Sequence, residues 1–154
     1  RARGLVALAL LAAGCAAPRT GMTLAGDDGR GVDYATEDPS LLVEISPLDD
    51  RPPFARHRLV VTNAGDVAID VERADLLADG GATIVPALVY PPDDLEAGAG
   101  MVAPGHRTEL VLEVAEGTSL PTAGEGAVRL HYRWLPLDRT EFVDVPVRFV
   151  AGNE

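Results

Sequence analysis

The chain has 154 residues, of which 24 are Asp or Glu and 13 are Lys or Arg, giving a formal net charge of -11. This length allows one ordinary domain with a hydrophobic core, and an apolar content of 47% is typical of a globular protein. The acidic balance disfavours nucleic-acid binding, which depends on clustered cations. A single cysteine excludes an internal disulfide and a zinc site built from several cysteines.

The N-terminal residues follow the order of a secretory signal peptide. Arg1 and Arg3 are followed by the apolar run 5–11 and then by the small residues 12–14. The uncharged stretch 4–18 is shorter than the roughly 20 residues that a membrane-spanning helix needs. The pattern therefore predicts a signal peptide over residues 1–14 that is removed, rather than a permanent span.

The run Leu11-Ala12-Ala13-Gly14-Cys15 resembles the lipobox of bacterial lipoproteins. The resemblance implies cleavage between Gly14 and Cys15, and acylation of the Cys15 thiol and the new N-terminus. It also implies placement at the outer membrane where a cell has two membranes, because Ala16 is not the acidic residue that retains such proteins at the inner membrane. An ordinary secretory signal, cut elsewhere and leaving Cys15 unmodified, is the alternative.

The acylated cysteine is expected to begin a flexible tether over residues 15–39. Four glycines at positions 21, 26, 29 and 31 interrupt any helical or strand period there. The acidic run 27–33 has carboxylates around glycines, but it lacks the ligand spacing of an EF-hand loop. A solvated acidic tether is the favoured interpretation.

After Pro39 the apolar residues follow the period of strands. Seven strands are expected, in chain order at 41–46, 58–62, 69–72, 83–85, 108–114, 127–134 and 143–149. Turn residues separate them, such as Asn63-Ala64-Gly65-Asp66 and Ala78-Asp79-Gly80-Gly81. About seven short strands with frequent turns predict an all-β, antiparallel sandwich over residues 40–151.

The run 127–134 has the clearest alternation of apolar and polar residues. It is expected to bury Val128, Leu130, Tyr132 and Trp134 and to expose Arg129, His131 and Arg133 to solvent. Tyr132 and Trp134 could instead form a carbohydrate platform, but core packing is favoured. In the last strand, Pro146 cannot donate a ladder hydrogen bond, which predicts an edge position or a bulge.

The order of the runs 59–65, 78–81, 102–106 and 110–114 resembles immunoglobulin-like domains of secreted bacterial proteins, including the mycobacterial immunoprotective antigen family. The resemblance covers about residues 41–150 and consists of turn residues and core alternation. It implies an immunoglobulin-like β-sandwich and says little about activity. The paired cysteines of antibody domains are not present.

Few residues offer catalytic chemistry. The sequence has no Gly-x-Ser-x-Gly elbow, no His-Glu-x-x-His motif and no lysine, so a protein without catalysis and without a cofactor is predicted. The three histidines, at 57, 106 and 131, are widely spaced, and no metal site is predicted. Met101, His106 and His131 are weak candidate ligands for the alternative, a periplasmic copper chaperone, although their spacing does not match a clustered Met and His motif.

Paired aspartates in proline-bearing loops, Asp49-Asp50 and Asp93-Asp94, suit either calcium binding or simple solubility. Taken together, the sequence predicts a lipid-anchored extracytoplasmic lipoprotein that faces the periplasm or the cell exterior. Its domain is expected to act as a non-catalytic binding or assembly module of the cell envelope. Its expected partners are the membrane, through the lipid, and an envelope protein.

Overall fold

The computed structural model describes residues 20–24, 34–35, 41–48, 56–93, 100–115, 118 and 124–151. These residues form ten strands: β1 (Thr20–Leu24), β2 (Tyr34–Ala35), β3 (Leu41–Pro47), β4 (Arg56–Asn63), β5 (Ile69–Ala78), β6 (Thr83–Tyr90), β7 (Met101–Val102), β8 (Arg107–Val114), β9 (Gly124–Trp134) and β10 (Arg139–Ala151). A three-residue turn, η1 (Asp79–Gly81), joins β5 to β6. In the part of the chain just listed, no helix is long and apolar enough to cross a membrane.

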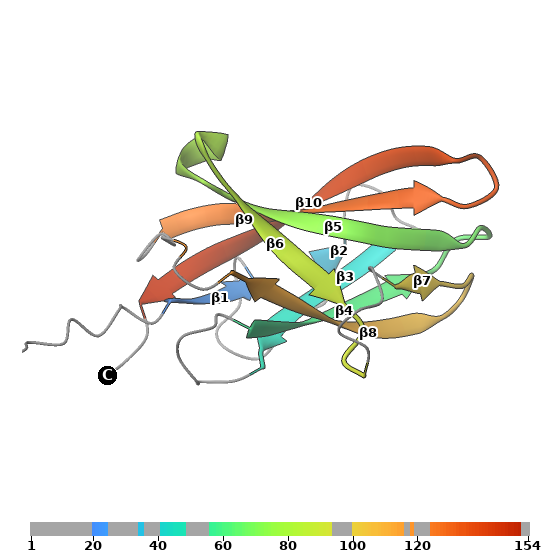
Figure 1. Cartoon of the computed structure of the whole chain (residues 1–154), viewed down its shortest axis with the longest axis horizontal. Coiled ribbons are helices and arrows are strands. Elements are labelled where there is room, and N and C mark those ends of the chain that lie inside the picture. Colours follow the sequence, from blue (N-terminus) through green and yellow to red (C-terminus); the bar gives the residue numbers. More distant parts are fainter. Residues whose placement is uncertain are drawn as a thin grey trace, which may run out of the picture.

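All ten strands belong to one antiparallel sheet, in the order β1-β10-β9-β5-β6-β8-β4-β3-β2, and β7 pairs with β5. The sheet curls until β1 lies against β3, so that it nearly closes around its core. Figure 1 shows β9, β10 and β5 on one side of this core and β3, β4 and β8 on the other. The prediction of an all-β antiparallel fold is confirmed, but the described strands number ten and form one continuous sheet.

Strand β6 is what makes the sheet continuous. Its residues from Thr83 to Ala87 pair with β5, and those from Ala87 to Tyr90 pair with β8. One strand therefore crosses from one side of the core to the other, as Figure 1 shows. The sequence predicts only the short strand 83–85 here, because Pro86 interrupts the β-branched run.

The core comes from the alternation that the sequence predicts. Val128, Leu130 and Tyr132 are buried, as are Leu41, Val43 and Ile45 in β3 and Val143, Val145, Val147 and Phe149 in β10. Trp134, also expected inside, is only partly buried and packs against the core from its rim. Its ring meets that of Tyr132 edge-on, with centroids 5.9 Å apart.

The position of Pro146 agrees with its chemistry. Strand β1 pairs with β10 only from Val147 to Ala151. In the described sheet, the part of β10 before Val147 pairs with β9 alone, so Pro146 lies at an edge. The sequence-based prediction of an edge position is confirmed.

Two strands lie inside the segment 15–39 that the sequence predicts as a flexible tether. Strand β1 pairs along its full length with the end of β10, and β2 pairs with β3. Met22 of β1 is among the most deeply buried side chains of the core. Gly21 therefore does not prevent strand formation in β1, because pairing with β10 supplies the missing local preference.

The sheet has two distinct ends. We call the end at which Thr20 of β1 lies opposite Ala151 of β10 the entry end. The other end, which we call the far end, carries the turns 64–68, 103–106 and 135–138, the last of which connects β9 to β10. Figure 1 shows this separation, with the end of β10 beside the start of β1 and the β9–β10 turn at the other extreme.

Asn63 holds two of the far-end turns together. Its side-chain amide nitrogen donates to the carbonyl oxygens of Val67 and Val102 at 2.7 and 3.0 Å, and its amide oxygen accepts from the backbone N–H of Gly65. Its backbone carbonyl also accepts from the N–H of Gly105 at 2.7 Å. One buried residue thus connects the turn after β4 with the segment around β7.

We expect Asn63→Ala to lower the free energy of unfolding by about 2 kcal/mol, because polar groups in and near the core lose their partners. Urea denaturation measures the loss. Asn63→Asp is the matched comparison, because it keeps the acceptor for Gly65 but removes the donor to the two carbonyls. Equal stability of Asn63→Ala and the wild type would contradict the role given to this residue.

Candidate functional site

The predicted lipidation site lies outside the described residues. This applies to Gly14 and Cys15, where cleavage and acylation are expected, and to three of the four loop aspartates, Asp49, Asp50 and Asp94. Asp93 is described and is exposed in the turn after β6. Calcium binding by these loops therefore stays a prediction.

Two of the three candidate metal ligands already have other partners. Met101 is exposed on β7, and the Nδ1 atom of His106 lies 2.9 Å from the carbonyl oxygen of Pro104. The Nε2 atom of His131 is 2.8 Å from a carboxylate oxygen of Asp75. No group of three His, Cys, Asp or Glu side chains suitable for a metal ion occurs in the described part of the chain.

The outer face of β9 differs from the expected solvated basic face. Arg129 and His131 point outward as predicted, but both are half-buried and each meets a carboxylate. Arg129 donates to both oxygens of Asp144 at 2.7 and 2.8 Å, and this hydrogen bonding raises the pKa of the guanidinium. His131 meets Asp75, which is itself buried. The partners lie on β10 and β5, the strands on either side of β9.

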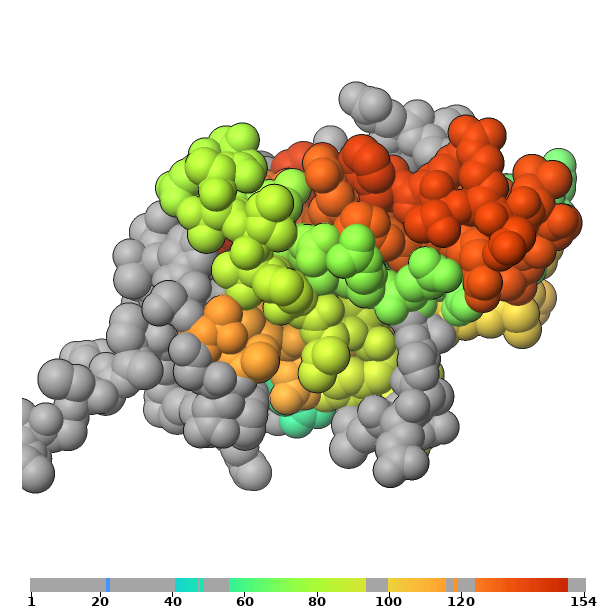
Figure 2. All heavy atoms as spheres, turned by 45° about the horizontal axis from the view of Figure 1, so that its top comes forward, coloured from blue at the N-terminus to red at the C-terminus, as the bar shows by residue number. Residues whose placement is uncertain are grey.

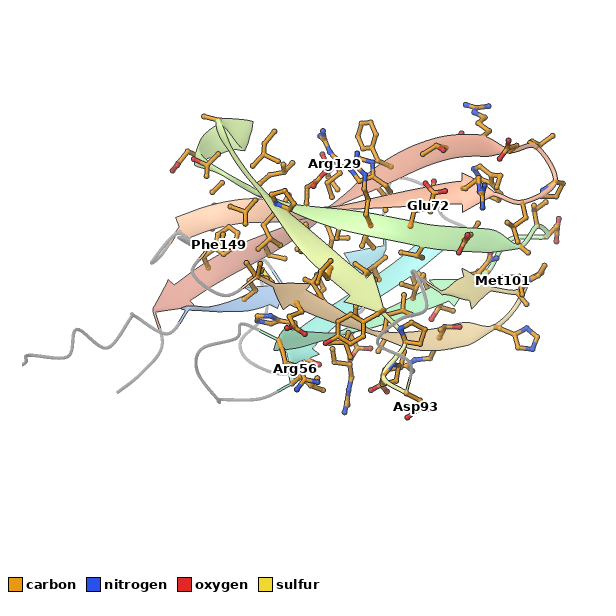
Figure 3. All side chains as sticks on the ribbon, in the orientation of Figure 1. Arg56, Glu72, Asp93, Met101, Arg129 and Phe149 are labelled. Carbon is orange, nitrogen blue, oxygen red and sulfur yellow. The ribbon has the colours of Figure 1, made fainter. Side chains whose placement is uncertain are left out.

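Phe142 covers part of this face. It lies opposite His131 in the register between β10 and β9, and the guanidinium carbon of Arg129 is 4.2 Å from the centre of its ring. Such cation–π contacts contribute about 0.5–1 kcal/mol at exposed sites. The aromatic ring therefore holds Arg129 in place and shields it from solvent. Figure 3 shows Arg129 on the outer side of the β9–β10 hairpin.

Arg133 is surrounded by three carboxylates. Its guanidinium nitrogens lie 3.2 Å from Asp70, 3.4 Å from Glu72 and 3.2 Å from Asp138. The hydrogen bond to Asp70 is the largest cause that raises the pKa of Arg133. Three negative charges around one positive charge leave this group, which we call the Arg133 cluster, with a net charge of -2.

A β-bulge interrupts β5 at one of these carboxylates, Glu72. Val71 lies opposite Tyr132 and Arg73 lies opposite His131, so Glu72 is the extra residue in β5. A bulge places two consecutive residues on one side of the strand, and both Glu72 and Arg73 are exposed. Without the bulge, the alternation that buries Ile69 and Val71 would turn Arg73 towards the core.

Three apolar side chains are exposed at the far end, beside the Arg133 cluster. Their exposed fractions are 71% for Leu137, 62% for Met101 and 38% for Leu135. Met101 lies opposite Asp70, and Asp70 lies opposite Arg133 in turn. Leu135 and Leu137 belong to the turn that follows β9, and Figure 2 shows this turn close to the segment around β7. We call these three residues the apolar tip.

Sequence reasoning does not identify the apolar tip or the Arg133 cluster. The alternation in β9 ends at Trp134, and the turn Leu135-Pro136-Leu137-Asp138 has the composition of neither a strand nor a polar loop. Two leucines in a four-residue turn are the available signal, because exposed turns are usually rich in polar residues.

His57 lies on β4, with its imidazole buried inside the sheet. Its side chain is 2% exposed, and its Nε2 accepts the backbone N–H of Met22 at 3.0 Å. That bond assigns the proton of the neutral ring to Nδ1, which is buried without a hydrogen-bond partner in the described structure. Desolvation by burial lowers the pKa of His57 to about 4.

The antiparallel, all-β fold defines the class of this protein. No family model matches the chain, and no curated protein does either. A solved structure titled "X-ray structure of Northeast Structural Genomics Consortium target SoR45" is similar at 12% sequence identity, with a TM-score of 0.47. The match covers 75% of this chain and 89% of that chain.

Proposed function

We propose that this protein is an extracytoplasmic lipoprotein anchored to the membrane through Cys15, and that its β domain is a non-catalytic binding or assembly module of the cell envelope. The lipobox-like run 11–15 carries the proposal. The position of β1 supports it, because β1 begins five residues after Cys15. Five residues span at most about 18 Å, which holds the entry end of the sheet close to an anchored cysteine.

The finer fold assignment belongs to the same proposal. We infer that the sheet is a variant of the immunoglobulin-like sandwich. Strands β3, β4 and β8 pair on one side of the core, and β5, β9 and β10 pair on the other. The crossing strand β6 then joins two sheets that are separate in a simple sandwich.

Binding rather than catalysis is favoured by how the titratable side chains are used. Inside the core, His57 accepts a hydrogen bond from the backbone of β1. On the outer face, His131 meets Asp75, and Arg129 meets Asp144. The outer-face contacts join neighbouring strands and the His57 contact joins β4 to β1 inside the core, so these side chains stabilise the fold. The far end, by contrast, presents exposed apolar side chains that suit contact with another molecule.

We expect Cys15→Ser to abolish acylation and to release the protein from the membrane fraction, because lipid anchoring depends on the thiol. Mass spectrometry of the N-terminus and sedimentation of membranes measure the two effects. Ala17→Ser is the control, since it changes a nearby residue and leaves Cys15 in place. The same unacylated N-terminus in the wild type and Cys15→Ser would disprove the anchoring.

The residue after the cysteine predicts in which membrane the protein is anchored. Because Ala16 follows the cysteine, the outer membrane is the expected location in a cell with two membranes. Density-gradient separation of the two membranes measures the location of the protein, and Ala16→Asp should move the protein to the inner membrane.

Chemical crosslinking in intact envelopes should recover a protein partner if the domain is a binding module.

A further inference from the structure

We propose that the apolar tip and the Arg133 cluster together form a docking surface for a polypeptide segment in which apolar side chains are flanked by arginine or lysine. This inference rests on the proposed binding function and names its surface and the chemistry of its partner. Exposed apolar area supplies the attraction, and the uncompensated carboxylates select the charge of the partner.

The apolar part of the surface consists of side chains that are largely exposed to solvent. Leu137 is 71% exposed and Met101 is 62% exposed, although both lie near the charged residues of the Arg133 cluster. The tip is held in a defined shape: the N–H of Leu135 donates to the carbonyl oxygen of Ala68 at 3.2 Å, and that of Leu137 donates to the carbonyl oxygen of Trp134 at 3.2 Å. A partner therefore meets a preformed surface, which lowers the entropy cost of binding.

The charge of the surface selects a cationic partner. Asp70, Glu72 and Asp138 all lie within 3.4 Å of the same guanidinium, so the Arg133 cluster has a net charge of -2. Elsewhere on this outer face the number of carboxylates around each arginine is closer to one, as for Arg129 and its partner Asp144. An arginine or lysine beside the tip would complete the pairing, whereas an acidic partner would be repelled.

The geometry of the sheet places this surface where a partner can reach it. The apolar tip lies at the far end, and β1, which follows the proposed anchor, begins at the entry end. Figure 1 shows the start of β1 and the β9–β10 turn at opposite ends of the sheet, and Figure 3 shows Met101 and Glu72 towards the far end. A domain held by Cys15 would direct the tip away from its own anchor.

Binding of synthetic peptides to the full chain in phosphatidylcholine nanodiscs tests the proposal. The first peptide has a Leu-Phe-Leu core flanked by arginines, the second has glutamates as flanks, and the third has serines in the core. Fluorescence anisotropy of the labelled peptides should give at least tenfold tighter binding for the first peptide than for either other, after subtraction of binding to empty nanodiscs. Equal affinities for the three peptides would overturn the proposal. The absence of any binding of the first peptide at concentrations up to about 1 mM would overturn it as well.

Matched variants locate the binding. Leu137→Ser should weaken the first peptide about tenfold, and the double variant Glu72→Gln with Asp138→Asn about fivefold, because it leaves Arg133 paired with Asp70 alone. Asp138 has a positive φ of 47°, which asparagine tolerates. Ile84→Ser and Glu125→Gln, exposed and near the entry end, are the controls and should change affinity less than twofold. A larger effect of the controls would refute the assignment.

The lipid alternative has its own outcome. In this outcome, the Cys15→Ser protein sediments with phosphatidylcholine vesicles, the added Leu137→Ser substitution abolishes the co-sedimentation, and the peptides do not bind. The apolar tip would then contact lipid, and the proposal would be wrong. Peptide binding does not depend on acylation. A failure of the peptides to bind would therefore not contradict the proposed lipoprotein function. Conversely, an unacylated Cys15 would remove the anchor and leave peptide binding at the tip measurable.

Discussion

Replacing Gly126 with alanine is expected to lower the free energy of unfolding by about 3 kcal/mol. Gly126 lies in β9, between Ala78 of β5 and Val147 of β10. An added Cβ would collide with the carbonyl oxygen of Leu77 and with the ring of Phe149. The carbonyl oxygen belongs to a paired strand and cannot move without distorting the sheet. Thermal or urea denaturation measures the loss.

Two further variants separate this collision from other effects. Ala127→Gly changes the next residue of the same strand, and it should cost less than about 1 kcal/mol because it adds no atoms. Phe149→Leu, combined with Gly126→Ala, relieves the contact with the ring but not the contact with Leu77. The double variant should therefore be more stable than the sum of the two single losses predicts. Strict additivity would show that the ring of Phe149 does not oppose the added methyl group.

Lowering the pH from 7 to 4 is expected to remove about 3 kcal/mol of stability through His57, because its pKa is about 4 in the folded protein and 6.5 as the reference value. Between these values the unfolded chain binds a proton at this residue and the folded chain does not. The contribution of His57 is therefore fully present above pH 6.5 and falls with pH through this window. In the strand register His57 lies opposite Pro47 of β3 and Leu112 of β8, and neither residue type carries a charge that would stabilise the imidazolium.

The difference in stability between the wild type and His57→Gln isolates this effect, because other groups titrate equally in both proteins. The introduced glutamine offers an oxygen that can accept the N–H of Met22, and its side chain does not titrate. The stability of the wild type relative to this variant should fall by about 3 kcal/mol between pH 7 and pH 4. Substituting the exposed His106 by Gln is the control. A pH-independent difference between wild type and His57→Gln would contradict the lowered pKa.

The same titration has a local consequence in β1. A protonated Nε2 is a donor and cannot accept the N–H of Met22. The protection of the Met22 amide against hydrogen exchange, measured relative to its intrinsic exchange rate at each pH, should therefore fall as the pH approaches 4. Amides in the middle of β9 provide the internal comparison, because they are not bonded to an imidazole.

The residues that face the core are predictable because they follow a period of two. The burial of Val128, Leu130 and Tyr132 follows from alternation alone. The same rule places His57 with Leu59 and Val61 on the inner side of β4, so its burial has a signal in the sequence. A histidine is usually expected at the surface or at a site, and this expectation outweighs its position in the alternation.

The partners of the outer-face charges are not predictable from local pattern. His131 meets Asp75 only because β5 and β9 are neighbours in a register that contains a bulge at Glu72. Pairing of strands this far apart in sequence depends on tertiary structure. Strand β1 escapes sequence-based prediction for the same reason, since its partner lies at the other end of the chain.

The pairing of β1 with β10 also sets the order in which the protein can fold. Leu24 and Val147, the pair of this ladder closest in sequence, are 123 positions apart. During synthesis from the N-terminus, β1 emerges before the other described strands, and its partner strand β10 becomes available only after all of them. Met22 and the imidazole of His57 cannot be enclosed before then. A chain built in this way completes its sheet only after its last strand has emerged, at a rate limited by this distant contact.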